Sequence, residues 1–570
     1  MESGGIARYM RGLLEEYKTL RGQSCRKGLR PMWDAVVITT ADEVQKEAFR
    51  LQVDDKIARK ELPLDLPIHL VSDPPGFKIG NGGSTLVALE FLNNLYGEKI
   101  FQMKILLIHA GGWSQRMPNA TILGKIFSAV PHGQPIYQML DLKLALYWPF
   151  VSIIAPGIFL VCADDILVYD LGEENDWSVP ARGFTALAHP SPISIGRTHG
   201  VYVIDEVEKL DTKKHVLVAN CLEVLQKPSD EKMKERGALL KSDDNHFEFA
   251  DGICMDGDIV YTDSSYYFGV DVMRKLLKLK QTLGSISCEI DAYGDFLQAL
   301  GQRSSDAYIF NTSNISQMTS ELIQVRKQAF DALQKTNLSL IIMNASRFIH
   351  IGTTKELIHH FCQDKDFQYQ LALEKNVFNC WGENLETEKK HIPDSHTDVA
   401  LPAGSLSKGC VMHSVLPRSS SVAENCIVEY CHFDIPVVFR DGSIISNCQW
   451  LKCDGQCRET LVVPENIFLH TVSVLLEGAS YFVTIFFAIS DNLKTSVPQS
   501  KLASLPFLHK TVGFALQQWQ LPERVVIPEV SKVSDDHSEV KRSLWTLKLY
   551  PGATSMTESL QMALEMIQCA

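Results

Sequence analysis

Short apolar runs alternate with helical patterns through the first third to half of the chain. The runs are rich in branched residues, and they predict strands at Ala35–Thr39, Ile68–Ser72, Ile105–His109 and Ile158–Cys162. Between them, apolar residues at helical spacing predict helices over Thr85–Leu95 and Ile136–Tyr147. Strands that alternate with helices indicate an α/β fold with a mostly parallel sheet covered on both faces. Ligands of such sheets bind beyond the C-terminal ends of the strands, so chemistry is expected there.

A second pattern follows a polar stretch, residues 383–403, which we interpret as a linker. Beyond it apolar residues recur every six positions, with one slip: Leu416, Val422, Val428, Val438, Ile444, Trp450, Val462 and Phe468. A period of six predicts a left-handed parallel β-helix with three short strands per turn. A β-sandwich with chance spacing is the alternative. We therefore expect a helical segment (1–32), an α/β domain (33–382), the linker, a β-helix-like domain (404–495) and a C-terminal extension (496–570).

Composition and charge exclude several classes of protein. A chain of 570 residues predicts more than one domain, and its net charge of −13 argues against a nucleic-acid partner. The most apolar stretch, Val472–Ile489, is interrupted by Glu477 and Gly478, so it predicts two buried strands rather than a membrane span. Fourteen cysteines without regular spacing indicate reduced thiols and a cytoplasmic protein.

A glycine loop with two cations follows the third predicted strand. Gly111 and Gly112 would let the backbone approach a phosphate closely, while Arg116 and Lys125 would supply positive charge to its oxygens. The alternative is an ordinary strand-to-helix turn with a surface arginine.

An earlier loop contains Gly80, Gly82 and Gly83 and opens a predicted helix. Glycines before a helix N-terminus form a ready anion site. The loop is neither a Walker A motif nor a Rossmann fingerprint. A tight helix cap explains it equally well, so the loop that holds a nucleotide stays open between the two.

Carboxylates follow several strands. Asp164 closes the fourth strand and suits Mg²⁺ (or Mn²⁺), whereas its neighbour Asp165 should point elsewhere. Asp263 is expected after a short strand, and Glu289 and Asp291 precede a helical stretch. Each is also explained as a helix cap or a turn residue.

Two further groups are weaker signals. Lys227 stands before Pro228 and could hold another phosphate. Cys448, Cys453 and Cys457 invite a metal interpretation, but their spacing lacks the paired C-x₂-C of zinc sites. We expect these cysteines to pack inside the β-helix.

This order of motifs resembles the sugar nucleotidyltransferase superfamily. The segments WDAVVITTADEVQKEAF, IGNGGSTLVALEFL, IHAGGWSQRMPNATILGKIF, THGVYVID and SCEIDAYGDFLQAL are similar to the fucose-1-phosphate guanylyltransferase family, and the resemblance runs from about Trp33 to Asn492. It implies a Rossmann-like nucleotidyltransferase domain followed by a β-helix. The implied reaction joins GTP and β-L-fucose 1-phosphate into GDP-L-fucose and pyrophosphate, in fucose salvage, with a divalent metal.

The resemblance also implies roles for individual residues. Arg116 and Lys125 match the superfamily's cationic loop, Asp164 its metal aspartate, Lys227 its sugar-phosphate lysine and Asp263 a second metal ligand. We expect Glu289 and Asp291 to accept hydrogen bonds from sugar hydroxyls. The loop from Gly111 to Arg116 reads Gly-Gly-Trp-Ser-Gln-Arg, where many members of the superfamily have Gly-Thr-Arg. The alternatives are another sugar 1-phosphate as substrate, or a catalytically silent regulatory homologue; the oligomeric state stays open.

Overall fold

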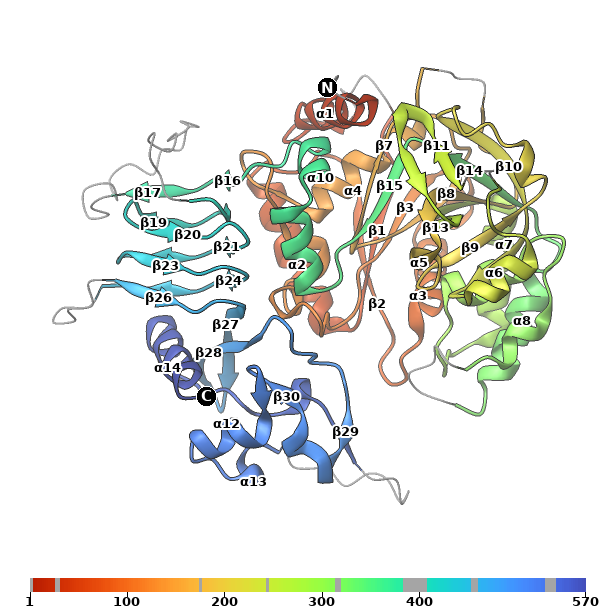
Figure 1. Ribbon diagram of the computed structural model, residues 1–570. Helices are drawn as coiled ribbons and strands as arrows, with labels where there is room; N and C mark the ends of the chain where they lie inside the picture. The colour runs from red at the N-terminus through yellow and green to blue at the C-terminus, as the bar shows by residue number, and fades with distance from the viewer. Residues whose placement is uncertain are drawn as a thin grey trace. The chain divides into compact units, whose positions relative to one another are not determined.

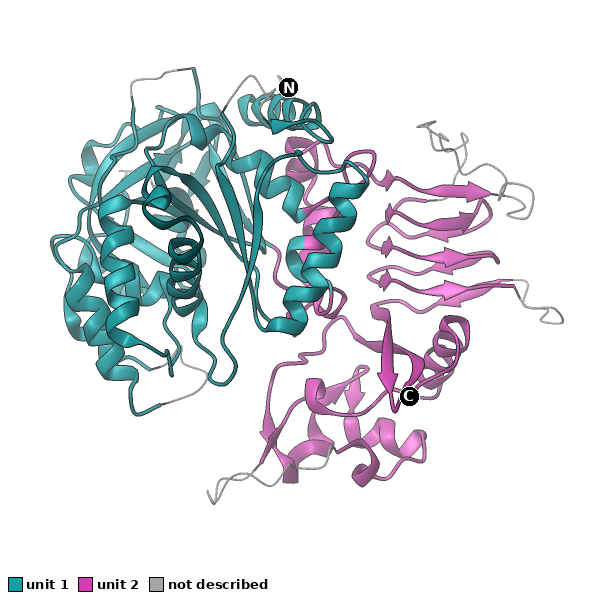
Figure 2. Cartoon of the chain, turned by 180° about the vertical axis from the view of Figure 1, so that it is seen from behind, with its two compact units in different colours: residues 1–112, 123–126, 139–350 teal, residues 113–122, 127–138, 351–570 magenta. Residues whose placement is uncertain are grey.

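The computed structural model describes residues 4–25, 31–173, 177–241, 245–312, 319–382, 407–452, 460–527 and 540–570. They form two compact units, shown in different colours in Figure 2. The first unit comprises residues 1–112, 123–126 and 139–350, and the second comprises residues 113–122, 127–138 and 351–570.

The second unit begins earlier than the predicted boundary at residue 383. Strands β16 (Asn376–Val377) and β17 (Cys380–Gly382) account for part of the difference, because they pair in parallel with β18 (Cys410–Met412) and β19 (Val415–Pro417); residues 351–375 also belong to the second unit. The predicted linker lies outside the described residues. The predicted domains 404–495 and 496–570 both fall in the second unit.

A nine-stranded sheet forms the centre of the first unit (Figure 1). Its order is β2-β1-β3-β6-β13-β8-β14-β10-β9, and β13 and β10 run against the other strands. The α/β class is confirmed, and the sheet is mixed. The strands are β1 (Ala35–Thr40), β2 (Ile68–Ser72), β3 (Lys104–His109), β6 (Gly157–Cys162), β8 (Phe184–Pro192), β9 (Gly200–Ile204), β10 (Val216–Gln226), β13 (Ile259–Gly269) and β14 (Leu338–Met343).

The four predicted strands are confirmed as β1, β2, β3 and β6, and the two predicted helices as α3 (Gly80–Tyr96) and α4 (Met139–Tyr147). Helix α3 packs with α7 (Val270–Leu283) and α8 (Leu322–Leu333) in one apolar core against the sheet. That core buries β3 and β6 residues almost completely. Strands covered in this way read as continuous apolar runs, which is why the sequence reveals them.

The N-terminal segment contains α1 (Gly5–Lys18), which belongs to the first unit. Its Tyr17 hydroxyl donates to Asp141 of α4 over 3.4 Å. The same carboxylate accepts a hydrogen bond from buried Lys56 of α2 (Glu43–Ala58) over 2.9 Å. A buried aspartate paired in this way fixes three helices to one another.

In the second unit, successive short strands join three parallel sheets in turn. The first sheet contains β18, β21 (Ile427–Glu429), β24 (Ile444–Ser446) and β27 (Ile467–Leu476), and the second contains β19, β22 (His432–Phe433) and β25 (Gln449–Trp450). The third sheet contains β20 (Ser421–Val422), β23 (Val437–Phe439) and β26 (Leu461–Val463). Cys410 pairs with Ile427 and Ile427 with Ile444, so these turns repeat every seventeen residues, whereas Ile444 pairs with Phe468, twenty-four residues on. A repeat of seventeen is one residue short of three sixes, which explains the slip in the six-residue pattern.

Small residues stack inside these turns. Ser414, Cys431 and Cys448 occupy equivalent positions, and the Cys431 N–H donates to the Ser414 hydroxyl over 3.1 Å. The Cys448 N–H lies 3.4 Å from the Cys431 sulfur. All cysteines in the described ranges are free thiols. Cys448 therefore packs inside the turns, as predicted, and Cys431 packs beside it, whereas Cys453 and Cys457 lie outside the described residues.

The apolar stretch Val472–Ile489 belongs to a hairpin of β27 and β28 (Ala479–Ala488). Two strands are confirmed, but they are buried only at the end away from the turn, and Leu475 is 71% exposed. Within the described residues, no helix is both long enough and apolar enough to span a membrane. The chain ends with α12 (Val512–Gln518), α13 (Glu523–Val526) and α14 (Met556–Cys569), and α14 packs on β28.

Candidate functional site

Asp164 follows β6 at the C-terminal edge of the sheet, as predicted. Its Oδ2 lies 2.8 Å from Nζ of Lys125 and 3.4 Å from Nε2 of His350, which ends β15 (Ser346–His350). Burial alone would raise the pKa of the Asp164 carboxyl, but the hydrogen bond to His350 and the charge of Lys125 hold it well below its usual range. The structure therefore brings Lys125 and Asp164 together, with an ionised carboxylate at the strand end.

Asp165 points away from Asp164, also as predicted. It begins β7 (Asp165–Tyr169), is buried, and forms an ion pair with the completely buried Lys143 of α4. Burial raises the pKa of Asp165, and the charge of Lys143 opposes that rise. The chain bends at Ala163 and Asp164 between β6 and β7, and this bend separates the accessible Asp164 carboxylate from the structural Asp165 carboxylate.

The loop after β3 is held by one side chain. Gln45 Oε1 accepts from the N–H groups of Ala41 and Gly112 over 2.8 and 3.3 Å, and its Nε2 donates to the Gly112 carbonyl over 2.9 Å. A Cβ on Gly111 would come within 2.9 Å of the backbone at Thr40 and Ala41, so the position requires glycine. Gln45 of α2 and the backbone at the end of β1 thus fix the conformation of this loop.

Arg116 lies in the segment 113–122, which belongs to the second unit. Its side chain is exposed and its carbonyl accepts from the N–H of Thr354 over 3.3 Å. Within the described residues it forms no ion pair. An exposed guanidinium of this kind is available to an anionic ligand.

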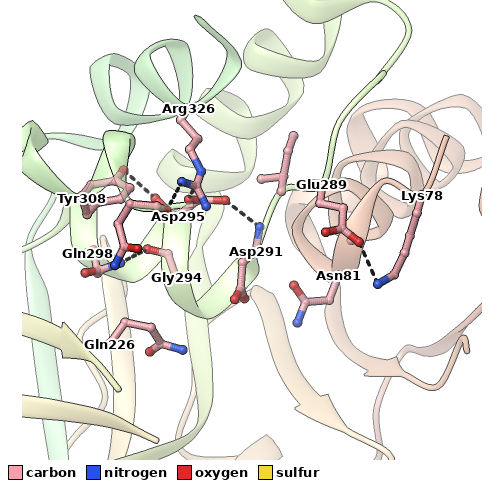
Figure 3. Close-up of a pocket in the computed structure, with 13 residues that line it drawn as sticks. Lys78, Asn81, Gln226, Glu289, Asp291, Gly294, Asp295, Gln298, Tyr308 and Arg326 are labelled. Atoms are coloured by element: carbon pink, nitrogen blue, oxygen red, sulfur yellow. Dashed lines mark hydrogen bonds and ion pairs between the residues drawn. The ribbon is translucent and has the colours of Figure 1, made fainter. Parts of the chain in front are cut away.

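A polar pocket of about 240 Å³ lies where the N-terminus of α3 meets the segment that carries Glu289 and Asp291 (Figure 3). Its side-chain lining includes Asn81, Gln226, Glu289, Asp291 and Arg326. In Figure 3, Asp291 lies between Gln226 and Asn81. Glu289 is mostly buried, and its Oε1 pairs with Nζ of the exposed Lys78 over 2.7 Å. The predicted acidic pair therefore does line a common pocket.

The glycines of α3 serve close packing in this structure. The Gly82 N–H donates to the Ile290 carbonyl over 2.8 Å, so it is not open to a phosphate. A Cβ on Gly80 would lie 2.4 Å from that carbonyl, and one on Gly83 would lie 2.7 Å from Ile79. Gly80 also lines the pocket. The tight-cap alternative thus explains Gly82 and Gly83, because a side chain at Gly82 would collide with Ile290 and one at Gly83 would collide with Ile79 at the start of α3.

Asp263 does not follow a strand, contrary to prediction. It lies within β13, at a bulge between Asp263 and Tyr266. Strand β13 continues because buried Ser264 and Ser265 find partners in His189 and the Tyr147 hydroxyl, at 2.6 and 2.9 Å. Polar residues at those positions made the strand look finished in the sequence.

Asp263 nevertheless shares a corner with two other predicted residues. Its Oδ1 accepts from the Gly200 N–H over 2.9 Å, and burial raises its pKa to about 7, with Asp291 adding to the rise and Lys227 opposing it. Lys227 follows β10 in a left-handed conformation (φ 45°). The structure thus gathers Lys227, Asp263 and Asp291 into one electrostatic neighbourhood.

Sequence reasoning missed several residues of these two clusters. Arg326 pairs with buried Asp295 over 2.9 Å, and burial raises the pKa of Asp295 to about 6. Asn81 Oδ1 accepts from the Ala292 N–H over 2.8 Å. Gln226 Oε1 is buried without a hydrogen-bond partner among the described residues. Gln226 directly precedes Lys227, and Asn81 lies in the first glycine loop, so both could have been found from motifs that the sequence analysis singled out. No motif in the sequence pointed to His350 or Arg326.

Together these features suit a small, polyhydroxylated anion. The pocket offers carboxylate and amide oxygens that can accept hydrogen bonds from hydroxyl groups. Lys227 supplies positive charge beside the pocket, and Lys125 supplies it at the end of β6. The ionised Asp164 is the kind of ligand that Mg²⁺ takes together with phosphate oxygens.

Comparison with known proteins agrees with this chemistry. A family model described as the fucose pyrophosphorylase domain matches residues 97–555. Fucose-1-phosphate guanylyltransferase of Homo sapiens is 38% identical over 562 residues, covering 97% of this chain and 87% of that protein. The enzyme of the same name from Mus musculus is 37% identical over 560 residues, covering 97% and 89%.

A more distant relative carries a second activity in its name. The bifunctional fucokinase/GDP-fucose pyrophosphorylase of Arabidopsis thaliana is 27% identical over 243 residues, covering 37% of this chain and 22% of that protein. The family model spans most of the chain, and the two mammalian relatives match nearly all of it. The chain therefore belongs to the fucose pyrophosphorylase family.

Proposed function

We propose that this chain is a fucose-1-phosphate guanylyltransferase, which transfers GMP from GTP to β-L-fucose 1-phosphate and yields GDP-L-fucose and pyrophosphate. The observation that carries the proposal is the 38% identity to the human enzyme of that name along 97% of the chain. The clusters around Asp164 and Asp291 support it, because they supply metal, phosphate and hydroxyl ligands.

In the proposed reaction a phosphate oxygen of fucose 1-phosphate attacks the α-phosphorus of GTP in line. A new bond forms between that oxygen and the α-phosphorus, while the bond between the α-phosphorus and the oxygen that bridges it to the β-phosphorus breaks. Pyrophosphate leaves with the electron pair of the broken bond. The nucleophile is already an anion, so no strong general base is needed. The protein's task is to position the reactants and to offset charge.

A divalent metal, Mg²⁺ or Mn²⁺, fits the residues at the sheet edge. Asp164 is ionised, and Lys125 and His350 already balance its charge, as a cation bound there would. Asp263 is the proposed second ligand, and a nearby cation would favour its ionised form. When bound, the metal would supply charge neutralisation at the phosphates of the substrates.

Cationic side chains would hold the phosphates. We assign Lys227 to the phosphate of the sugar, because it adjoins the acidic corner of Asp263 and Asp291. Lys125 and Arg116 are assigned to the leaving pyrophosphate, as the family resemblance implies. The Gly111–Gly112 loop is our choice for the nucleotide phosphates, because it follows β3, the neighbour of β6 in the sheet, whereas Gly80 lines the other pocket and the Gly82 N–H is bonded to Ile290. The Gly112 N–H is bonded to Gln45, so contact with a phosphate is assigned to the backbone at Gly111.

The polar pocket would hold the sugar. Asp291 and Glu289 would accept from fucose hydroxyls, and the unpartnered Gln226 Oε1 would accept from a third. Buried acceptors left unpaired by a wrong sugar discriminate strongly, whereas a missing hydroxyl in an apolar wall discriminates weakly. We therefore expect side activity with sugar 1-phosphates that share the hydroxyl arrangement of fucose, and little with mannose 1-phosphate.

We also propose that the stack in the second unit is a left-handed parallel β-helix. Support comes from three parallel sheets that receive successive strands in turn and from the seventeen-residue repeat. A crystal structure of the second unit would show the hand directly.

A pyrophosphate-release assay across four nucleoside triphosphates and several sugar 1-phosphates tests the proposed function. GTP with fucose 1-phosphate should give the highest kcat/KM. A preference for another sugar would overturn the substrate assignment while keeping the chemistry. Absence of release with every pair, from protein that is folded by circular dichroism, would indicate a silent homologue.

A further inference from the structure

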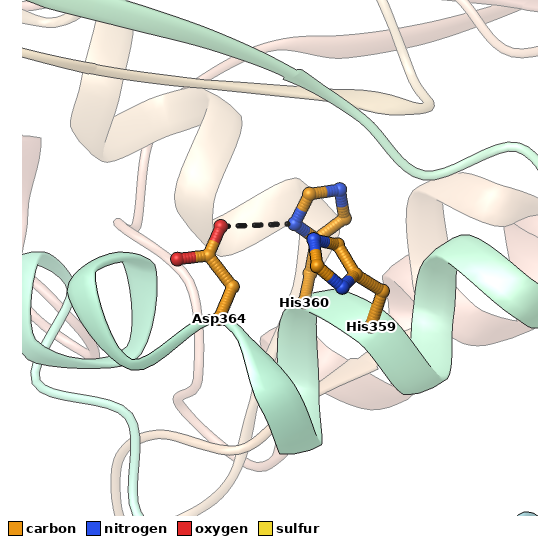
Figure 4. A group of neighbouring side chains, drawn as sticks. All are labelled: His359, His360 and Asp364. Carbon is orange, nitrogen blue, oxygen red and sulfur yellow. Dashed lines mark ion pairs between the residues drawn. The ribbon is translucent and has the colours of Figure 1, made fainter.

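A cluster of metal-binding side chains lies in the second unit, apart from the residues assigned to the reaction. His359 and His360 begin the π-helical turn η11 (His359–Gln363), and Asp364 directly follows it; the turn joins α9 (Thr354–Ile358) to α10 (Lys365–Gln370). One donor atom of each residue lies within 4.8 Å of the other two donors. Figure 4 shows the two rings side by side and the carboxylate facing them.

The π-helical turn explains why three donors meet. In an α-helix, only residues three or four apart share a face. A π turn closes between residues five apart, so it brings His359 over Asp364 while His360 stays within reach of the same carboxylate. Such widened turns are uncommon and cluster at functional sites.

Hydrogen bonds orient the side chains of Asp364 and His359. His360 Nδ1 is buried, has no hydrogen-bond partner among the described residues, and lies 3.5 Å from Asp364 Oδ2. The other oxygen, Asp364 Oδ1, accepts from the Phe367 N–H over 3.0 Å and so fixes the carboxylate. His359 Nδ1 lies 3.3 Å from Gln363 Oε1, and donation along that contact leaves Nε2 with its lone pair.

We propose that His359, His360 and Asp364 bind a zinc ion. Two imidazoles and one carboxylate are the ligand set of tetrahedral Zn²⁺ sites in which a fourth position stays open. The 3.5 Å between His360 Nδ1 and Asp364 Oδ2 is close to the edge of a tetrahedron built on metal–ligand bonds of about 2 Å.

The same ligand set argues against other ions. Mg²⁺ and Ca²⁺ require oxygen ligands, so the metal proposed for the transfer reaction would not compete here. Because His359 is exposed, the open position faces solvent. The bound ion would tie the π turn to the first turn of α10.

Zinc titration of the full-length protein tests the site. Protein stripped with a chelator is titrated with Zn²⁺ in a buffer containing Mg²⁺, against a chromophoric competitor. Wild type should bind one equivalent more than the double variant H359N/H360N. Asp364→Asn should weaken that equivalent at least about tenfold, although asparagine can still cap α10.

His246→Asn is the matched control, because His246 is an exposed histidine that pairs with a carboxylate, Asp256, at 2.8 Å and does not belong to the cluster of His359, His360 and Asp364. This variant should bind as many equivalents of zinc as wild type. Any zinc bound by the exposed thiols of Cys254 and Cys569 should be the same in wild type and in every variant. All variants should have wild-type circular dichroism. Equal stoichiometry and affinity in wild type and H359N/H360N would show an ion pair only and overturn the proposal.

Discussion

Two adjacent aspartates with opposite environments give the sharpest test at the scale of single residues. Asp164→Asn should lower turnover at least about a hundredfold, because it removes the proposed metal ligand. Asp165→Asn should instead destabilise the fold by about 3–5 kcal/mol, since it leaves the buried charge of Lys143 without its partner. Pyrophosphate release and thermal unfolding, measured on both variants, separate the two effects.

Raising Mg²⁺ provides the control for that pair. The turnover of Asp164→Asn should recover in part at high Mg²⁺, whereas the unfolding midpoint of Asp165→Asn should not move. If Asp165→Asn is as stable as wild type, its ion pair contributes nothing. If Asp164→Asn keeps normal turnover, the metal assignment is wrong.

The sugar pocket yields a second prediction for individual side chains. Asp291→Asn should raise the KM for fucose 1-phosphate at least about tenfold, because it replaces one carboxylate oxygen by an NH₂ group and leaves only a neutral amide oxygen to accept from the hydroxyls. Glu289→Gln should raise it less, since Lys78 already shares that carboxylate. The KM for GTP should change little in either variant.

Asp306→Asn is the control, because this exposed carboxylate does not line the pocket. Steady-state kinetics with each substrate varied in turn supply the measurement. A rise confined to the KM for GTP would move the acidic pair to the nucleotide or metal site.

Sequence alone predicted the accessible side of this site better than its buried side. Asp164 was distinguished from Asp165 because the apolar run of the strand stops at Asp164, and the end of such a run is a local feature of the sequence. His350 was not found, because it reaches Asp164 from a strand far along the chain. Asp263 was assigned to a strand end because partners for Ser264 and Ser265 lie on other elements.

At the scale of elements, predictions succeeded where burial on both faces left long apolar runs, as in β1, β3 and β6. The short strands of the second unit were visible only through their repeat. A strict six-residue repeat drifts by one residue in each seventeen-residue turn, so individual facing positions were misplaced. Val438 and Val462, both assigned by the pattern, are not fully buried for that reason.

Strand β27 carries a pH-dependent contribution to stability. His470 is buried with Nδ1 3.1 Å from the Ser446 hydroxyl, and burial lowers its pKa to about 4. In the unfolded chain the imidazole has a pKa near 6.5, so between about pH 6.5 and 4 it binds a proton there but stays neutral in the folded protein. Folding stability therefore decreases as the pH falls below about 6.5. Between pH 7 and 5 this residue should cost about 2 kcal/mol.

Urea unfolding at both pH values, followed for wild type and His470→Gln, measures that cost as the difference between the two proteins. Other titrating groups act equally in both and cancel. Wild type should lose more stability than the variant on acidification. An equal loss would mean that the folded imidazole titrates normally.

At the scale of the whole molecule, the second unit is assembled from separate parts of the chain. Asn119 Nδ2 donates to buried Glu429 of β21 over 2.8 Å, and the Glu374 N–H donates to the Pro131 carbonyl over 2.7 Å. Gln138 Nε2 also donates to the Tyr430 hydroxyl over 3.4 Å, so the segments 113–122 and 127–138 both contact residues that follow residue 407. Sequence patterns could not show this, because a short segment between two strands carries no mark of a distant partner.

This assembly predicts that removing the C-terminal part abolishes turnover. A fragment of residues 1–382 keeps every residue assigned to the reaction, but it leaves Asn119 without Glu429 and strands β16 and β17 without β18 and β19. The segment that carries Arg116 would lose its support, and the exposed strand edges would favour aggregation. The fragment should be poorly soluble and at least about a hundredfold less active.

A protease site inserted between residues 383 and 406 separates loss of the strands from loss of chain continuity. Cleavage there should leave turnover near that of the intact protein, because β16–β18 and β17–β19 pairing holds the two pieces together without the connecting segment. Glu429→Gln, which keeps an oxygen for Asn119, should be mild, whereas Glu429→Leu should lower the unfolding midpoint. Full activity in a soluble 1–382 fragment would show that the segment bearing Arg116 folds without the C-terminal strands, and the cleaved protein's activity would then carry no information about their pairing.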